Sequence, residues 1–152
     1  GLLLAVALGS TALAAAGSLW SLEAKRDKEA ELLFAGDQIR NAITAYRQKA
    51  PAGQPHAFPK SLIELLDDKR WPTRQRHLRK VFLDPMTGSA EWGLVLAPDG
   101  SLMGVFSRSD GMPLKRGLFP ENYATFEEAK SYRDWRFVHS AATAPAARTS
   151  AP

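Results

Sequence analysis

The sequence contains no cysteine in its 152 residues. Disulfide bridges, thiolate zinc sites, iron–sulfur clusters and thiol nucleophiles are therefore excluded for this chain. Its formal charge is only +4, from 20 Lys and Arg against 16 Asp and Glu. So small a surplus does not by itself indicate a nucleic-acid-binding protein. The 45% apolar and 24% charged content is ordinary for a folded chain of one domain.

Proline and charge are both missing from the beginning of the chain. All ten prolines lie at Pro51 or later, and no charged residue precedes Glu23. Because proline interrupts helices, its absence permits one helix from Gly1 to about Ala50. The chain then divides into an apolar segment 1–22, a charged segment 23–50, a turn-rich domain 51–139 and a tail 140–152. The tail is rich in small residues and proline and is expected to be disordered.

The uncharged segment Gly1–Leu22 is long enough to cross a membrane. As a helix it would extend about 33 Å, and the hydrocarbon core of a bilayer is about 30 Å thick. A retained membrane anchor is the preferred interpretation. Two other interpretations stay open. The first is a signal peptide that is removed, because the triplets at 12–14 and 14–16 resemble signal-peptidase sites. The second is a buried core helix, because an apolar helix also suits the interior of a domain.

Residues 23–50 are predicted to continue the same helix in amphipathic form. Glu23–Glu31 is dense in both signs and predicts a solvated collar, in which Lys25 and Glu29 are spaced to pair. Pro51 and Gly53 are expected to end the helix. Beyond the collar, apolar positions recur every three or four residues and predict packing on a domain: Leu32, Ala35 or Gly36, Ile39, Ala42 or Ile43, and Tyr46.

The domain 51–139 is predicted to begin with a short helix and a hairpin. Residues 62–68, LIELLDD, favour a helix of two or three turns, with Ser61 as its candidate N-cap. Trp92–Leu96 and Leu102–Phe106 read as two strands around the turn residues of 97–101.

Later segments complete the prediction. Thr125–Glu128 favours a second short helix, and the alternation of residues 132–138 favours a last strand. The aromatic side chains are expected to fill a small core. The predicted fold class is α+β: a long N-terminal helix, transmembrane in its first half and amphipathic in its second, packed on a small antiparallel sheet.

No motif for catalysis is present. A nucleophile elbow, a glycine-rich phosphate loop and clustered metal ligands are all missing from the sequence. The chain is therefore not expected to be an enzyme, and no catalytic, cofactor-binding or metal-binding residue is assigned. His56, His77 and His139 stand apart, and each is expected to be a surface or hydrogen-bonded histidine.

Calcium stays open as a cofactor. Asp84, Asp99 and Asp110 lie in predicted loops, where their oxygens could meet around a Ca²⁺ ion. Their spacing fits no EF-hand, and each is equally explained as a turn residue. No other cofactor is expected.

One charge cluster occurs, with no acid from Lys69 to Leu83. Its six members are Lys69, Arg70, Arg74, Arg76, Arg79 and Lys80. One interpretation is a site for an acidic partner or lipid headgroups. The preferred one is a solvated face partly neutralised by Asp67, Asp68 and Asp84. Nucleic acid is not an expected partner, because no recognition motif accompanies the cluster.

The assembled pattern resembles the type IV pilin-like proteins, and most of all the major-type pseudopilins of bacterial type II secretion systems. A short helix, an Asp-Pro turn and a hairpin follow the long helix between Phe58 and Phe106, as in major-type sequences. The family's cleavage glycine, aromatic residue and early glutamate would lie at or before Gly1. The segments that carry the resemblance are LLLAVALGSTALAAAG, KEAELLFAGDQIRNAITAYRQ, FPKSLIELLDD, RHLRKVFLDPMTG and EWGLVLAPDGSLMGVFS.

This resemblance implies a structural subunit without catalysis. It would be a single-pass protein of the bacterial inner membrane, with its C-terminal domain in the periplasm, that assembles into a pseudopilus driving protein export. The implied partners are other pilin-like subunits through the N-terminal helix 1–22, the inner-membrane assembly machinery, and the bilayer before assembly. The alternatives are a minor pilin of a type IV pilus or related filament, and a periplasmic or membrane-anchored binding domain.

Overall fold

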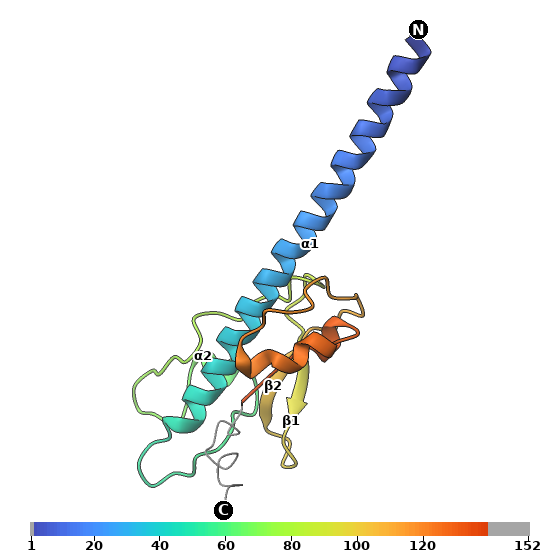
Figure 1. Cartoon of the computed structure of the whole chain (residues 1–152). Helices are drawn as coiled ribbons and strands as arrows, with labels where there is room; N and C mark the ends of the chain where they lie inside the picture. The colour runs from blue at the N-terminus through green and yellow to red at the C-terminus, as the bar shows by residue number, and fades with distance from the viewer. Residues whose placement is uncertain (1, 140–152) are drawn as a thin grey trace, which may run out of the picture.

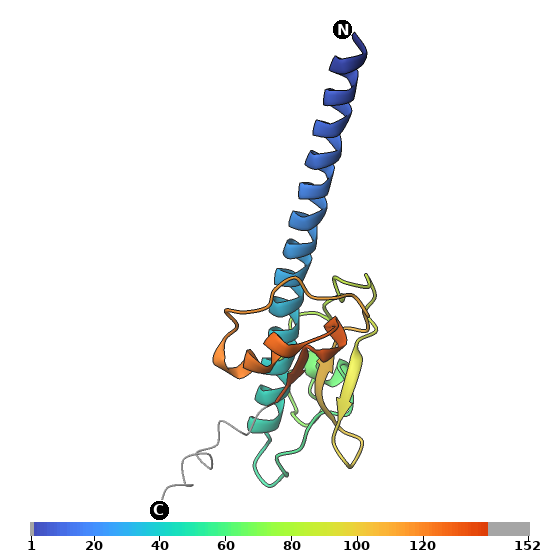
Figure 2. The same ribbon diagram turned by 45° about the vertical axis from the view of Figure 1, so that its right-hand side comes forward.

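The chain folds into a long helix and a small α+β domain. The computed structural model describes the backbone of residues 2–139 and the side chains of residues 17–139. Helix α1 (Leu2–Gln48) projects from the domain, which packs around its C-terminal part (Figures 1 and 2). The predicted continuous helix is thus confirmed over Leu2–Gln48. The predicted tail 140–152 lies outside the described residues.

The predicted membrane-crossing segment Gly1–Leu22 falls mostly on residues 1–16, whose side chains lie outside the described residues. The backbone of α1 is helical from Leu2 onward through this segment. In the described part of the chain, no helix contains a stretch that is long and apolar enough to span a bilayer.

The domain contains a three-stranded antiparallel sheet in the order β1-β2-β3. Strands β1 (Gly93–Leu96) and β2 (Leu102–Phe106) form the predicted hairpin. In its turn Gly100 has a φ of +86°, which glycine adopts without the clash that a Cβ causes. Strand β3 (Arg136–Val138) pairs with the other edge of β2. The hairpin and its turn are therefore confirmed.

The inner face of α1 packs on this sheet. Gly36 lies against the ring of Phe137 on β3, and a Cβ at position 36 would overlap that ring. Close by, Arg40 Nε donates a hydrogen bond to the carbonyl oxygen of Val138 at 2.9 Å. The predicted apolar stripe is confirmed, since all of these residues are buried: Leu32, Ala35, Ile39, Ala42, Ile43 and Tyr46.

Aromatic side chains fill the space between α1, the sheet and the C-terminal loops, as predicted. The rings of Phe126 and Trp135 stack with centroids 5.5 Å apart and an interplanar angle of 4°. Such pairs add about 0.5–1.5 kcal/mol to the stabilisation from burial alone. The buried aromatic residues of this core are Tyr46, Trp92, Tyr123, Phe126, Tyr132, Trp135 and Phe137.

The first short helix is smaller than predicted. Helix α2 (Ile63–Leu66) is a single turn rather than two or three. Ser61 does not cap it, because the N-cap position is Leu62 and no side chain makes a capping hydrogen bond. Instead, the Glu64 carboxylate reaches back and accepts the backbone N–H of Lys60 at 2.7 Å. This bond ties the turn to the residue before it, and α2 has no side-chain cap of its own.

The C-terminal elements also differ from the prediction. The second short helix is a 3₁₀ helix, η1 (Glu121–Glu128), which begins before the predicted Thr125. The last strand begins only at Arg136, because Tyr132–Asp134 form another 3₁₀ turn, η2. Asp134 Oδ2 accepts the backbone N–H groups of residues 130 and 131 at 2.9 and 3.2 Å. Such local side-chain bonds compete with extended backbone.

Candidate interaction surface

Helix α1 has a buried inner face and an outer face that meets solvent. The outer face is defined here by Leu19, Trp20, Glu23, Asp27 and Phe34. Leu19 is 63% exposed, Trp20 78% and Phe34 59%, and the two acids are exposed as well. Because large apolar side chains on a surface often mark sites of association, this outer face is the candidate functional surface.

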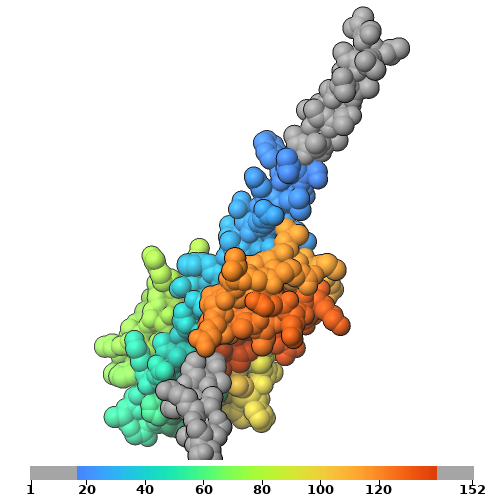
Figure 3. Space-filling model, viewed as in Figure 1, coloured from blue at the N-terminus to red at the C-terminus, as the bar shows by residue number. Residues whose placement is uncertain are grey.

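Around Phe34 the domain flanks α1 on both sides and leaves this part of the outer face in a trough. In Figure 3 the light-blue helix lies between an edge of green atoms and an edge of orange atoms. On the first side is a hollow of about 480 Å³, called the basic hollow, lined by Phe34, Gln38, Arg76, Arg79, Lys80 and Phe82.

On the second side of α1, a hollow of about 690 Å³ lies beside the C-terminal loops. At its rim Leu118 is 95% exposed and has a φ of +61°, a conformation that is costly for a residue with a Cβ. Tyr123 in its wall hydrogen-bonds Asp37 on α1. Burial and this carboxylate raise the pKa of Tyr123, so its hydroxyl stays a proton donor.

Phe34 belongs to the walls of both hollows. Its ring meets that of Phe82 edge to face, with centroids 5.9 Å apart. Lys80 Nζ lies 5.2 Å from the centre of the Phe82 ring, within range of a cation–π interaction. The basic hollow therefore combines an exposed aromatic floor with a cationic rim.

The predicted basic cluster separates into a neutralised part and an unpaired part. Asp68 is 1% exposed, and Arg70 Nη2 and His77 Nε2 lie 2.7 and 2.9 Å from its Oδ2. Lys69 pairs with Asp67 at 2.6 Å. Neutralisation by Asp67 and Asp68 is thus what the structure shows for this part of the cluster.

Asp84 was also expected to neutralise the cluster, and this is wrong. Its buried carboxylate accepts the Ser107 hydroxyl at 2.6 Å and the Met86 backbone N–H at 2.9 Å. The Asp84 carboxylate is therefore enclosed in the domain, where these two neutral groups donate hydrogen bonds to it. No carboxylate among the described side chains lies within 4 Å of the remaining cations, which are Arg74, Arg76, Arg79 and Lys80.

The Asp68 network ties the C-terminal end of α1 to the domain. Arg70 Nη2 donates to the carbonyl oxygen of Tyr46, and the guanidinium stacks 3.7 Å from the centre of the Tyr46 ring. Burial alone would raise the pKa of Asp68, but hydrogen bonds from Arg70 and His77 outweigh it and lower the pKa to about 2. Asp68 is therefore ionised across the physiological range.

Glu29 is not part of a solvated collar, which corrects the prediction for this residue. It is 3% exposed and accepts the backbone N–H of Leu114 at 2.6 Å and the Tyr132 hydroxyl at 2.9 Å. It forms no ion pair with Lys25, whose Nζ instead lies 5.9 Å from the Tyr132 ring centre. Glu29 precedes Leu32 by three positions and so shares its face, a signal available in the sequence.

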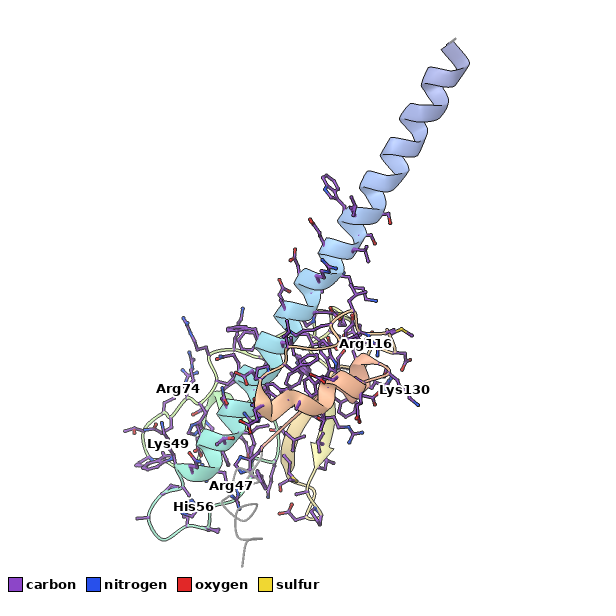
Figure 4. All side chains as sticks on the ribbon, viewed as in Figure 1. Arg47, Lys49, His56, Arg74, Arg116 and Lys130 are labelled. Carbon is purple, nitrogen blue, oxygen red and sulfur yellow. The ribbon has the colours of Figure 1, made fainter. Side chains whose placement is uncertain are left out.

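The three histidines lie apart, as expected. His77 bonds Asp68, His56 Nδ1 lies 2.9 Å from the Arg47 carbonyl oxygen, and His139 Nδ1 lies 2.8 Å from the Thr44 hydroxyl. Figure 4 shows His56 and Arg47 at the C-terminal end of α1, with Arg74 on the other side of the helix from Arg116.

The three loop aspartates do not converge. Asp84 faces Ser107, Asp99 accepts the backbone N–H of Ser101 at 2.9 Å, and Asp110 pairs with Arg133 at 2.6 Å. Each has the local role of a turn or surface residue. Among residues 17–139 no group of three or more potential ligands is placed to hold a metal ion.

We compared the chain with known protein families, with curated proteins and with solved structures, and none of the three comparisons found a match.

Proposed function

We propose that the chain is a pilin-like structural subunit, most like a pseudopilin of a bacterial type II secretion system. It is anchored in the inner membrane by Gly1–Leu22, carries its domain in the periplasm, and assembles into a pseudopilus that drives protein export. Its role is mechanical rather than catalytic. Calcium remains a candidate cofactor of this proposal without an assigned ligand set.

The observation that carries the proposal is the division of α1 into two halves. From Glu29 onward the helix is bound to its own domain by a buried stripe, whereas residues 17–28 are exposed except for Lys25, whose Nζ lies near the Tyr132 ring. Leu19 and Trp20 belong to this projecting part and are exposed. A helix with this division suits a subunit whose first half is covered by lipid or by other subunits.

Assembly moves the apolar helix from one apolar environment, the bilayer, to another, the helices of neighbouring subunits. Hydrocarbon and neighbouring apolar helices are similar in polarity, so moving a helix from one to the other costs little transfer free energy. Packing between small residues then sets the geometry of the assembly. The assembly machinery of the inner membrane supplies the work of extraction.

Deleting the gene in its own bacterium tests the proposal. We expect the deletion to abolish export of secreted proteins to the medium, and the full-length gene to restore it. Normal export with lost surface pili would assign the chain to a type IV pilus instead. A protein recovered only from the soluble periplasm, without residues 1–16, would contradict the anchor and favour the binding domain.

A pair of matched variants separates assembly from folding. Leu19→Glu places a charge on the projecting helix, and Leu94→Glu places one on β1, where the side chain is also exposed. Both are expected to leave the domain folded, because neither side chain is buried. Export should fail only with Leu19→Glu, and equal export by the two variants would contradict the proposal.

A further inference from the structure

A cavity of about 370 Å³ lies where α1 leaves the domain. Glu29 is the first buried residue of α1 in the part whose side chains are described, because residues 17–28 are exposed except for the half-buried Lys25. We therefore call this cavity the exit pocket. Its wall is formed by Arg26, Glu29, Ala30 and Leu33 of α1 and by Leu114 and Lys115 of the loop that precedes η1.

The exit pocket offers positive charge to a ligand. The Glu29 carboxylate in its wall already accepts the backbone N–H of Leu114 at 2.6 Å and the Tyr132 hydroxyl at 2.9 Å. Arg26 and Lys115 have no carboxylate within 4 Å among the described side chains. Guanidinium and ammonium groups both bind phosphate and carboxylate oxygens. The pocket therefore fits an anionic group.

The exit pocket lies close to the proposed membrane boundary. The uncharged segment ends at Leu22, and Arg26 follows four residues later, which is about 6 Å along the helix. Lipid headgroups extend about 5–7 Å beyond the hydrocarbon core. The Cα–Cβ bonds of a helix are tilted toward its N-terminus, so the Arg26 side chain begins in the direction of this layer.

Lys115 reaches the same layer from the loop. Its backbone N–H donates to the Glu29 carboxylate at 3.3 Å, so its backbone lies level with Glu29, about 10 Å beyond Leu22. A lysine side chain covers the remaining distance by extending toward the headgroups. The two cations of the pocket therefore converge on the headgroup layer from two elements.

Apolar side chains continue the Arg26 side of α1 toward its N-terminus. Leu22 precedes Arg26 by four residues, Leu19 precedes it by seven, and Leu33 follows it by seven. Residues at these spacings lie on one side of a helix. Leu19 is 63% exposed and Leu22 is 42% exposed. A molecule with an anionic head and an apolar body, lying along this side, meets the cations with its head and the leucines with its body.

We propose that the exit pocket binds the headgroup of one anionic phospholipid. Arg26 and Lys115 bind its phosphate, and the side of α1 that carries Leu19 and Leu22 lies against its acyl chains. The inference rests on the proposed function only in placing the membrane boundary at Leu22. It names the lipid class that the membrane-inserted chain selects and the residues that select it.

The basic hollow does not fit this lipid as well. Its helical wall, Phe34 and Gln38, lies about 18–24 Å beyond Leu22 and therefore outside the headgroup layer. An acidic segment of another protein is the competing occupant of the exit pocket. Such a segment would satisfy the two cations but would leave Leu19 and Leu22 without a partner.

Lipid retention by the full-length chain tests the site. The chain would be inserted into nanodiscs of equal phosphatidylglycerol and phosphatidylcholine, extracted in mild detergent and analysed by native mass spectrometry. We expect each chain to retain phosphatidylglycerol and not phosphatidylcholine. Arg26→Gln with Lys115→Gln should lower this retention by about tenfold or more, because each cation near an anionic surface strengthens binding by about fivefold. The double variant keeps the backbone N–H of residue 115 and hence its bond to Glu29.

The matched control is Arg74→Gln with Lys130→Gln. It also removes one arginine and one lysine, both exposed and neither lining the exit pocket (Figure 4). Retention of phosphatidylglycerol should stay at the native level in this control. Equal losses in the two double variants, or equal retention of the two lipids by the native chain, would overturn the proposal.

Inorganic phosphate distinguishes a lipid site from a site for any phosphate. Added in large molar excess to the extracted chain, it should leave the retained phosphatidylglycerol in place, because phosphate makes no contact with the leucines. Leu22→Ser should weaken retention although both cations remain. Displacement of the lipid by phosphate alone would overturn the assignment to a lipid.

Measuring export beside lipid retention separates this inference from the proposed function. If Arg26→Gln with Lys115→Gln abolishes export but retains phosphatidylglycerol at the native level, the two cations bind a protein and the proposal is wrong. Selective retention by the native chain, with export unchanged by gene deletion, would keep the lipid site and reject the secretion role. Loss of export on gene deletion without selective retention would do the reverse.

Discussion

The two halves of α1 share one helical backbone but have opposite surroundings. In the docked half, Ile39 is fully buried, Gly36 lies against an aromatic ring, and Glu29 is enclosed by backbone donors. In the projecting half, Gly17 has open space around it, Leu19 is largely exposed, and Glu23 meets solvent. Equivalent residue types therefore have structural roles in one half and remain free for partners in the other.

This difference shows which interactions stabilise the helical conformation in each half of α1. Helix propensity alone rarely holds a long helix in water, and most helical stability in proteins comes from packing one face. The docked half has that packing within the chain. The projecting half lacks it in the described structure, so we expect substitutions there to change association and to leave the stability of the domain almost unchanged.

The largest contrast is expected between Ile39→Ala and Leu19→Ala. Truncating buried Ile39 leaves a cavity under α1 and should cost about 3–4 kcal/mol of unfolding free energy. Leu19→Ala removes an exposed side chain and should change it by less than about 0.5 kcal/mol. Urea denaturation followed by tryptophan fluorescence measures both. Similar losses in the two variants would mean that the projecting half contributes to the folded core.

The next contrast concerns two glutamates. Glu29→Gln removes the negative charge of the carboxylate that accepts hydrogen bonds from the Leu114 N–H and the Tyr132 hydroxyl. We expect it to lower the free energy of unfolding by about 2–3 kcal/mol. Glu23→Gln changes an exposed residue and is the control. Amide hydrogen exchange at Leu114 provides a local readout and should quicken only in Glu29→Gln. Unchanged protection there would show that the carboxylate does not hold the loop.

Acid should weaken the docked end of α1 through Asp68. Its pKa is about 2 in the folded protein, below the value near 3.9 of an unfolded aspartate. A lowered pKa adds stability at pH values above the unfolded pKa. This stability is lost as the pH falls from about 4 to 2, and here it amounts to about 2–3 kcal/mol. In Asp68→Asn the stability should depend less on pH across this window. An equal dependence in both proteins would contradict the assignment.

The smallest contrast is between two glycines of the same helix. Gly36→Ala should destabilise the domain by about 1–2 kcal/mol, because the new methyl group must displace Phe137. Gly17→Ala should favour the helix by about 0.5–1 kcal/mol, because alanine loses less backbone entropy. Circular dichroism during thermal unfolding records both signs. Stabilisation by Gly36→Ala would show that the helix and sheet are not in close contact.

Periodic and turn signals accounted for the parts of the fold that depend on neighbours in the chain. The stripe from Leu32 to Tyr46 and the hairpin around Gly100 were both predicted correctly. Predictions from single residues were wrong where the backbone could form either of two local hydrogen-bonding arrangements. Ser61 does not cap α2, where the Glu64 carboxylate bonds the backbone of Lys60 instead. The strand predicted for 132–138 is shorter than expected because Asp134 closes a turn.

Contacts between residues that are distant in the sequence decide the features of the candidate surface that the sequence did not predict. The basic cluster between residues 69 and 80 was visible, but not its separation into cations bound by Asp67 and Asp68 and cations left on the rim of a hollow. Phe34, which joins the two hollows, was not singled out beforehand. These features depend on which loops meet α1, and sequence spacing carries no information about that meeting.

The length of α1, its buried stripe and the glycine turn follow from steric and periodic rules that act within a few residues, and could therefore be read in advance. The burial of Glu29, the ionised Asp68 network and the trough around Phe34 required the folded chain. Each joins residues far apart in the sequence, and the free energy of a charged or apolar group depends on what encloses it.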